Sequence, residues 1–190
     1  MKDCVFIMRV IAGKARRLQL KTPKGLDTRP TTDRIKETLF NMIQDELYDI
    51  RFLDMFSGSG GIGIEALSRG AQYSVFVERN REACEIIKEN LHTTHLEGQG
   101  KVMNMPALSA ITALKSLEAF HVVFMDPPYG LGLEKEVLKH PDFMDILEDK
   151  ALIIVEADLD TVLSDEDIPG MHILKEKIYK TNKHIFLEKN

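Results

Sequence analysis

A glycine-rich turn between a strand and a helix does most to limit how this chain can fold. Residues 52–56 (Phe-Leu-Asp-Met-Phe) have the apolar character of a buried strand, and residues 62–69 have the spacing of a helix. Between and just beyond them lie Gly58, Gly60 and Gly63, in the order G-x-G-x-x-G. Glycines let the backbone approach a ligand closely, and the N-terminus of the following helix offers free N–H groups to an anion. The pattern predicts a cofactor site at the end of a strand in an α/β domain.

Strand-like and helix-like segments alternate through the rest of the chain. Beyond the glycine turn, strands are expected at residues 73–77, 101–104, 120–125 and 151–156, and helices at residues 81–93 and 108–117. A terminal antiparallel pair is expected at residues 172–179 and 184–189. This alternation predicts an α/β fold with a mostly parallel sheet and helices on both of its faces.

The first 49 residues differ in character from the remainder. Residues 8–21 have the pattern of a short β-hairpin, and a helix is expected from about Thr31 to about Tyr48. We therefore divide the chain into an N-terminal hairpin and helix extension, residues 1–49, and a cofactor-binding domain, residues 50–190.

Charge is distributed unevenly between these two parts. The net charge is −5, but residues 1–36 hold ten lysines and arginines against three acids, whereas the remainder holds 15 basic and 27 acidic residues. This asymmetry favours contact between the N-terminal extension and a polyanion, although a solvated basic hairpin gives the same pattern.

Acids at strand ends accompany the glycine turn. Glu78 ends the next strand, twenty residues after Gly58, where an acid can bind both hydroxyls of a ribose. Asp54 lies four residues before Gly58; it would repel the pyrophosphate of a dinucleotide but suits the ammonium group of a methionine-type cofactor. Glu65, in the first turn of the following helix, fits a helix start as well as a cofactor contact. The turn therefore favours S-adenosylmethionine, although G-x-G-x-x-G alone also fits a nicotinamide-dependent oxidoreductase.

The loop Asp126-Pro127-Pro128-Tyr129 follows the apolar strand at residues 120–125. Its two prolines fix φ and remove two N–H donors, which leaves the Asp126 carboxylate and the Pro127 carbonyl as acceptors. Rigid acceptors suit an –NH₂ group, and Tyr129 offers a flat face to a planar base. Because an exocyclic base amine is a poor nucleophile, the loop would act by holding the amine toward an activated methyl group.

This loop resembles the Asn/Asp-Pro-Pro-Tyr/Phe motif of class I amino-methyltransferases. The wider sequence resembles the bacterial 16S ribosomal RNA guanine-N2 methyltransferase family over nearly the whole chain from Met8. The matching stretches are residues 8–13, 28–41, 53–60 and 63–71. The Arg-Pro-Thr stretch within residues 28–41 is specific, since general methyltransferases lack it.

The resemblance implies a seven-stranded class I fold, S-adenosylmethionine as the methyl donor, and the N2 amine of a guanine in small-subunit ribosomal RNA as the acceptor. It also implies action on a partly assembled ribosomal particle. By resemblance, the cofactor site is lined by Asp54, Ser57, Gly58, Gly60 and Glu78. The guanine would be held by Asp126, Pro127 and Tyr129. The candidate RNA contacts are Arg16, Arg17, Arg29, Thr31 and Arg34.

One position departs from the family pattern. The family has an Asp before Ala at the end of the third strand, near the adenine of the cofactor, and here Pro106 occupies that place. Because Pro106 has no N–H to donate, we expect Asn104 or the backbone of Met105 to take over the adenine contact.

The residues alone leave other functions open. The motif also permits a DNA adenine or cytosine amine, or a protein glutamine amide, as the acceptor, and a non-catalytic RNA-binding module could keep the same fold. The histidines and the two cysteines have no metal-ligand spacing, so we expect no metal. The lack of a signal-like or membrane-spanning apolar run predicts a cytoplasmic protein, and we expect a monomer.

Overall fold

Seven strands form one mostly parallel sheet in the computed structural model, which describes residues 8–23 and 33–190. The strand order is β5-β4-β3-β6-β7-β9-β8. The first five strands in this order are parallel, whereas β9 runs antiparallel to both of its neighbours. The strands are β3 (Arg51–Met55), β4 (Tyr73–Glu78), β5 (Gly100–Asn104), β6 (Phe120–Met125), β7 (Leu147–Ala157), β8 (Met171–Ile178) and β9 (Lys183–Lys189). The predicted α/β class and its antiparallel terminal pair are confirmed.

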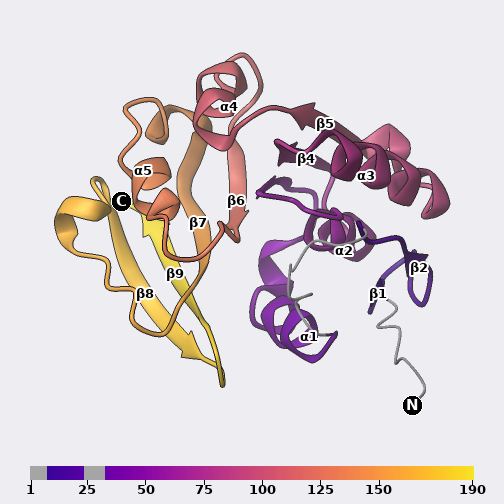
Figure 1. Ribbon diagram of the computed structural model, residues 1–190, viewed down its shortest axis with the longest axis horizontal. Helices are drawn as coiled ribbons and strands as arrows, with labels where there is room; N and C mark the ends of the chain where they lie inside the picture. Colours follow the sequence, from indigo (N-terminus) through magenta and orange to yellow (C-terminus); the bar gives the residue numbers. More distant parts are fainter. Residues whose placement is uncertain (1–7, 24–32) are drawn as a thin grey trace.

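Helices cover both faces of this sheet (Figure 1). They are α1 (Asp33–Met42), α2 (Gly61–Arg69), α3 (Arg81–Thr93), α4 (Ala107–Leu114) and α5 (Leu133–Leu138). Because side chains alternate along a strand, Leu53 and Val75 join the core under α4 and α5, whereas Phe52 and Phe76 join the core under α1, α2 and α3. Among the residues that the structure describes, no helix is long and apolar enough to cross a membrane.

The first helix ends earlier than the sequence predicts. Its expected start near Thr31 lies outside the described residues, and α1 ends at Met42 instead of continuing to about Tyr48. Ile43 has φ −119° and ψ 15°, outside the α-helical range, and a short 3₁₀ turn, Gln44–Glu46, follows. Both Ile43 and Leu47 are still buried. The apolar spacing therefore predicted the burial of Ile43 and Leu47 correctly, but it did not predict their backbone conformation.

A two-stranded hairpin precedes the sheet, as predicted. Strands β1 (Met8–Arg9) and β2 (Gln19–Leu20) pair in antiparallel fashion near α2 (Figure 1). The backbone amide of Lys14 donates to the carbonyl of Ser68 at 2.8 Å. A Cβ atom on Gly13 would lie only 1.8 Å from that same carbonyl oxygen, so only glycine permits this approach. Val10 and Leu20 share the core under α2, and the division of the chain at residue 50 stays a prediction.

The sheet order reverses direction between β3 and β6. From β3 the chain moves outward to β4 and β5, then returns to place β6 on the other side of β3. The register aligns Met55 with Met125 and Met125 with Val155, so the carboxyl ends of β3, β6 and β7 lie side by side. In open α/β sheets ligands bind outside the carboxyl ends at such a switch point.

Candidate active site

The glycine turn joins β3 to α2 through left-handed backbone. Gly58 has φ +54° and Gly60, the N-cap of α2, has φ +78°. The predicted strand ends one residue early, at Met55, because Phe56 also adopts a positive φ of 62°. The hydroxyl of Ser57 donates to the carbonyl of Asp54 at 2.6 Å and thus closes the turn on itself. The predicted cofactor residues Ser57, Gly58 and Gly60 are therefore brought together with α2.

Asp54 lies beneath this turn with its carboxylate buried. Its Oδ2 accepts a hydrogen bond from the backbone amide of Gly63 at 2.9 Å, in the first turn of α2. Burial raises the pKa of Asp54 to about 7, against the effect of the Gly63 hydrogen bond, and the charge of Glu78 adds to the rise. A bound cation would favour the carboxylate form.

Glu78 ends β4 beside the same turn. Its Oε2 accepts from the amide of Gly58 at 2.9 Å, and its Oε1 accepts from the amide of Asn80 at 2.8 Å. These two bonds hold the carboxylate at the glycine turn. A carboxylate has about four acceptor sites, so Glu78 retains capacity for the hydroxyls of a ligand.

The side chain of Asn104, at the end of β5, bonds to the backbone at the end of β4. Its Nδ2 donates to the backbone carbonyls of Glu78 and Arg79, at 3.1 and 3.0 Å, and the amide of Met105 donates to the Glu78 carbonyl at 3.1 Å. Asn104 thus ties the ends of β4 and β5 together. Pro106 is the N-cap residue of α4, where its missing N–H costs no helical hydrogen bond. The adenine contact of Asn104 stays a prediction.

The Asp-Pro-Pro-Tyr loop continues directly from β6, on the other side of the switch point. Pro127 is buried, Asp126 is partly buried, and Tyr129 is 47% exposed, so its ring is accessible. Burial raises the pKa of Asp126 well above its usual range, and the charges of Glu156 and Asp54 raise it further.

Sequence reasoning missed a further acid at this edge, Glu156, near the end of β7. It is only 5% exposed, and its Oε1 lies 3.3 Å from the hydroxyl of Tyr129. Asn182 and His184 also bond to this carboxylate. The signal that found Glu78, an acid at the end of an apolar strand, is equally present in residues 151–156.

Four carboxyl groups therefore line the carboxyl ends of four parallel strands: Asp54 on β3, Glu78 on β4, Asp126 after β6 and Glu156 on β7. Within residues 8–23 and 33–190, none of them forms an ion pair with a lysine or an arginine. A row of carboxyl groups repels the negative charge of a pyrophosphate and attracts a cationic ligand. It weighs against the dinucleotide alternative.

Comparison with known proteins assigns the family. The chain matches the protein family described as "Conserved hypothetical protein 95" over residues 8–188, which is nearly its whole length. The chain belongs to this family.

Several relatives of this chain are named as ribosomal RNA methyltransferases. The chain is 41% identical over 157 residues to YlbH of Bacillus subtilis, named as a candidate rRNA methyltransferase, covering 82% of this chain and 85% of that one. It is 36% identical over 156 residues to "Ribosomal RNA small subunit methyltransferase D" of Escherichia coli, covering 82% and 77%. A solved structure of yhhF from Escherichia coli, described as a candidate methyltransferase, superposes with a TM-score of 0.82 at 33% identity over 97% of this chain and 98% of that one. The resemblance and the methyltransferase fold expected from the sequence are confirmed.

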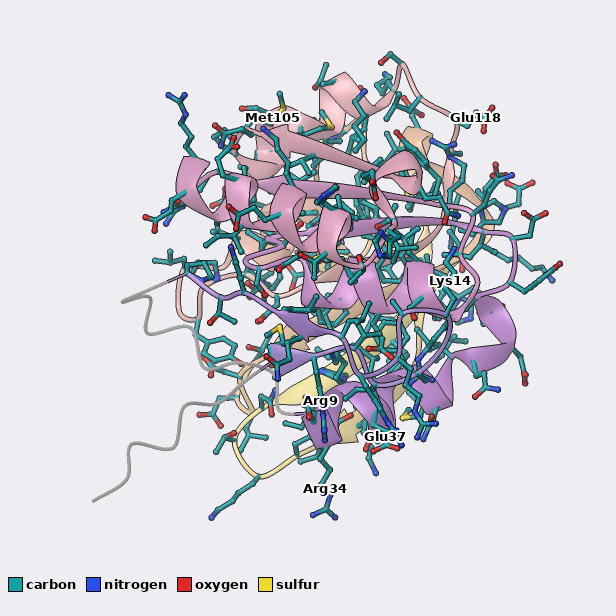
Figure 2. The ribbon with its side chains drawn as sticks, turned by 90° about the vertical axis from the view of Figure 1, so that its right-hand side faces the viewer. Arg9, Lys14, Arg34, Glu37, Met105 and Glu118 are labelled. Carbon is teal, nitrogen blue, oxygen red and sulfur yellow. The ribbon has the colours of Figure 1, made fainter. Side chains whose placement is uncertain are left out.

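The structure describes three of the five residues expected to contact RNA. Arg16 and Arg17 are exposed between β1 and β2, and Arg34 is exposed in the first turn of α1. Figure 2 shows Arg9 and Arg34 at the same end of the molecule, opposite Met105 in the loop after β5. The other two candidates, Arg29 and Thr31, lie outside the described residues.

Glu65 has neither of the roles considered from the sequence. Its carboxylate is fully buried and accepts from the amides of Ile11 and Ala12 in the hairpin, at 2.8 and 3.0 Å. It also pairs with Arg69 at 2.8 Å and with the buried Lys36 at 3.4 Å. Glu65 thus fastens the hairpin and α1 to α2, behind the glycine turn.

A surface hollow of about 540 Å³ opens beside the Asp-Pro-Pro-Tyr loop. Its lining consists of Gly130, Glu134, Asp158, Leu159, Asp160, Thr161 and Thr181. Three carboxylates in this lining disfavour a phosphate, so the hollow can accept a base or a ribose more readily than an RNA backbone. The basic hairpin and α1 are the better candidates for phosphate contact in this family member.

Proposed function

We propose that this protein transfers a methyl group from S-adenosylmethionine to the exocyclic N2 amine of a guanine in small-subunit ribosomal RNA. The observation that carries the proposal is the alignment of two sites at one switch point. The glycine turn with Asp54 and Glu78 lies on one side of it, and the acceptor loop beginning at Asp126 lies on the other. Membership in a family with small-subunit rRNA methyltransferases supports the choice of RNA.

The residues at the glycine turn fit the proposed cofactor. S-adenosylmethionine supplies an activated methyl group on a sulfonium. The free N–H groups at the start of α2 suit its carboxylate, Asp54 suits its ammonium group, and Glu78 suits its ribose hydroxyls. The row of uncompensated carboxyl groups matches the net positive charge of the ligand.

The acceptor loop does its work by positioning the amine. Asp126 and the carbonyl of Pro127 accept hydrogen bonds from the two N–H groups of N2, and the exposed ring of Tyr129 stacks on the guanine. Pro127 and Pro128 restrict φ, so the acceptors keep their direction. The amine nitrogen must lose one proton in the reaction, and a carboxylate at Asp126, with its raised pKa, can hold that proton.

The RNA backbone is held at the basic N-terminal part. Arg16, Arg17 and Arg34 contact phosphates from the hairpin and the start of α1, together with Arg29 and Thr31 from the segment between them. The substrate is the RNA within an assembling ribosomal particle, and the protein acts as a monomer in the cytoplasm. The assignment of the ribosomal particle rests on the family resemblance, whereas the monomer and the cytoplasm are the expectations drawn from the sequence itself.

Methylation of purified small subunits tests the proposal. Subunits from a strain that lacks the endogenous enzyme are incubated with labelled S-adenosylmethionine, and the digested RNA is examined by mass spectrometry. We expect N2-methylguanosine at one site, and more with assembled particles than with free RNA. Label in adenosine, in DNA or in protein glutamine would contradict the proposed acceptor.

The substitution Asp126→Ala connects this activity to the acceptor loop. It should abolish methyl transfer and leave cofactor binding nearly unchanged. A matched control is Asp149→Ala, which removes an exposed aspartate from β7. Near wild-type turnover by the Asp126 variant would show that the loop has been assigned the wrong role.

A further inference from the structure

A chain of hydrogen-bonded polar side chains runs inward from the acceptor loop. The hydroxyl of Tyr129 lies 3.3 Å from Oε1 of Glu156, and Oε2 of Glu156 lies 3.2 Å from Nε2 of His184. The other ring nitrogen of His184 lies 3.3 Å from the hydroxyl of Tyr179. Asn182 donates its Nδ2 to Oε1 of Glu156. The chain thus joins the loop after β6, the end of β7 and the start of β9.

The acceptor character of a carboxylate fixes the direction of these bonds. With Glu156 as a carboxylate, which can only accept, Tyr129, Asn182 and His184 all donate to it. His184 then carries its proton on Nε2, and in the neutral ring Nδ1 accepts from Tyr179. Glu156 is therefore held by donors from two elements while it holds the hydroxyl of Tyr129.

Tyr129 depends on this bond for its orientation. Within the part of the chain that the structure describes, Glu156 is the hydrogen-bond partner of the Tyr129 side chain. The loop that follows contains Gly130 and Gly132, both with positive φ, so the backbone beyond Tyr129 has glycine freedom. Tyr129 is 47% exposed, so packing restrains its side chain less than it restrains a buried one.

We propose that Glu156 is a positioning residue of the methyl-acceptor site: it fixes the Tyr129 ring through its hydroxyl, and it lies beside Asp126, because Met125 and Val155 pair at the ends of β6 and β7. This inference rests on the proposed function, because it gives Tyr129 and Asp126 their tasks toward the base. It extends that function to a residue outside the Asp-Pro-Pro-Tyr motif.

The groups facing Asp126 come from each element packed around it. Asp54 faces it from β3 and Glu156 from β7, and Tyr129 belongs to its own loop. His184 of β9 lies behind Glu156. Burial and the two neighbouring carboxylates all raise the pKa of Asp126. Removing the charge of Glu156 should therefore lower that pKa.

The substitution Glu156→Gln separates charge from hydrogen bonding. Tyr129 and Asn182 both donate to Oε1, which a glutamine oxygen can replace. The new amide would face Nε2 of His184, which can accept after a change of tautomer, with Nδ1 then donating to Tyr179. The complementary substitution Tyr129→Phe removes the hydroxyl and leaves the charge of Glu156 in place.

The first measurement needs no RNA. The carboxyl carbon of Asp126 is followed by ¹³C NMR titration in the wild type and in Glu156→Gln, with Asp126→Asn to assign the signal. We expect the titration in Glu156→Gln to move to lower pH by about one unit, a typical size for the loss of a close like charge. The control Glu148→Gln, at the opposite end of β7, should leave the titration in place. An unchanged Asp126 titration in folded Glu156→Gln overturns the inference.

The second measurement is the pH dependence of methylation of small subunits. Because activity requires the Asp126 carboxylate, kcat/KM falls as the pH falls through its pKa, and Glu156→Gln should shift this acid limb downward by the same amount. Tyr129→Phe should raise the KM for RNA about tenfold without moving the acid limb of the pH profile. If Tyr129→Phe keeps the wild-type KM, the positioning role is wrong. The two proposals can fail separately. If the Asp126 titration shifts in Glu156→Gln but the wild type does not methylate small subunits, the proposed function is wrong. The relation between Glu156 and Asp126 is then still supported.

Discussion

The backbone amide of Gly58 donates a hydrogen bond to the carboxylate of Glu78 at 2.9 Å, across twenty residues of chain. This bond joins the glycine turn after β3 to the end of β4. The turn and the acid are therefore set relative to each other before any ligand is present, which lowers the ordering cost of binding.

Replacing Glu78 should weaken cofactor binding more than it weakens the fold. Glu78→Ala removes the acceptor for Gly58 and Asn80 and for the proposed ribose hydroxyls. Hydrogen bonds to a charged group are worth about 1.5–3 kcal/mol, so we expect the Kd for S-adenosylmethionine to rise about 10- to 100-fold. Isothermal titration calorimetry measures this, with Glu82→Ala on the exposed side of α3 as the control. Equal affinities for the two variants would remove Glu78 from the site.

Cofactor affinity should increase as the pH rises through neutrality. The pKa of Asp54 is raised to about 7, so below that pH much of it is protonated and cannot attract a cation. A cationic ligand favours the carboxylate, and binding then releases a proton; affinity should fall by up to tenfold per pH unit below about pH 7. Titration calorimetry between about pH 5.5 and 8.5 in buffers of different ionisation enthalpy measures both effects. In Asp54→Asn the affinity should be weak and nearly independent of pH; a wild-type profile there would assign the proton to another group.

Loss of Glu65 should destabilise the whole protein. Glu65→Ala leaves the buried Lys36 and Arg69 without their carboxylate partner, although Lys36 still donates to the Arg9 carbonyl, and it leaves two hairpin amides without an acceptor. Breaking a buried charge pair in this way typically costs about 3–5 kcal/mol in the free energy of unfolding. Urea denaturation followed by circular dichroism measures the change, and Glu37→Ala, which removes an exposed acid from α1 (Figure 2), is the matched control. Adding Lys36→Met to the Glu65 variant should restore part of the loss, because it removes the unpaired charge; the absence of any rescue would count against this account.

The basic hairpin and α1 should contribute to the affinity for RNA and not to the chemical step of methyl transfer. The double substitution Arg16→Gln and Arg34→Gln removes two exposed charges. The affinity for RNA should decrease, and the slope of its logarithm against salt should drop by about 1 for each phosphate that the variant no longer neutralises. Filter binding at several salt concentrations tests this, with Lys101→Gln on β5 as the control. A salt slope equal to that of the wild type would place the RNA elsewhere.

The sequence predicted the fold class because the relevant signals are local. Apolar runs with period two and amphipathic runs with helical spacing show which residues are buried, and α3 begins and ends at the residues expected. The same signal failed after Met42, where Ile43 and Leu47 are buried without helical backbone. Burial and backbone conformation are separate properties, and periodicity reports the first of them.

The motif residues of the proposed site were also predicted from the sequence. A glycine turn, an acid at a strand end and a proline-rich loop each act through neighbouring residues, so Gly58, Glu78 and Asp126 could be named in advance. Parallel strands place their carboxyl ends at one edge of a sheet, which brings such residues together without further information. Local motifs therefore predicted both the class of the proposed site and its place at the carboxyl edge of the sheet.

The pairing of side chains that are distant in sequence could not be predicted from local patterns. Glu156 meets His184 because β7 and β9 pair in antiparallel register, and Glu65 meets Lys36 because α1 packs on α2. Both pairings depend on strand register and helix docking, which arise from the summed packing of the whole core. No local pattern encodes that sum, since shifting β9 by one residue would turn His184 to the other face of the sheet without changing the sequence.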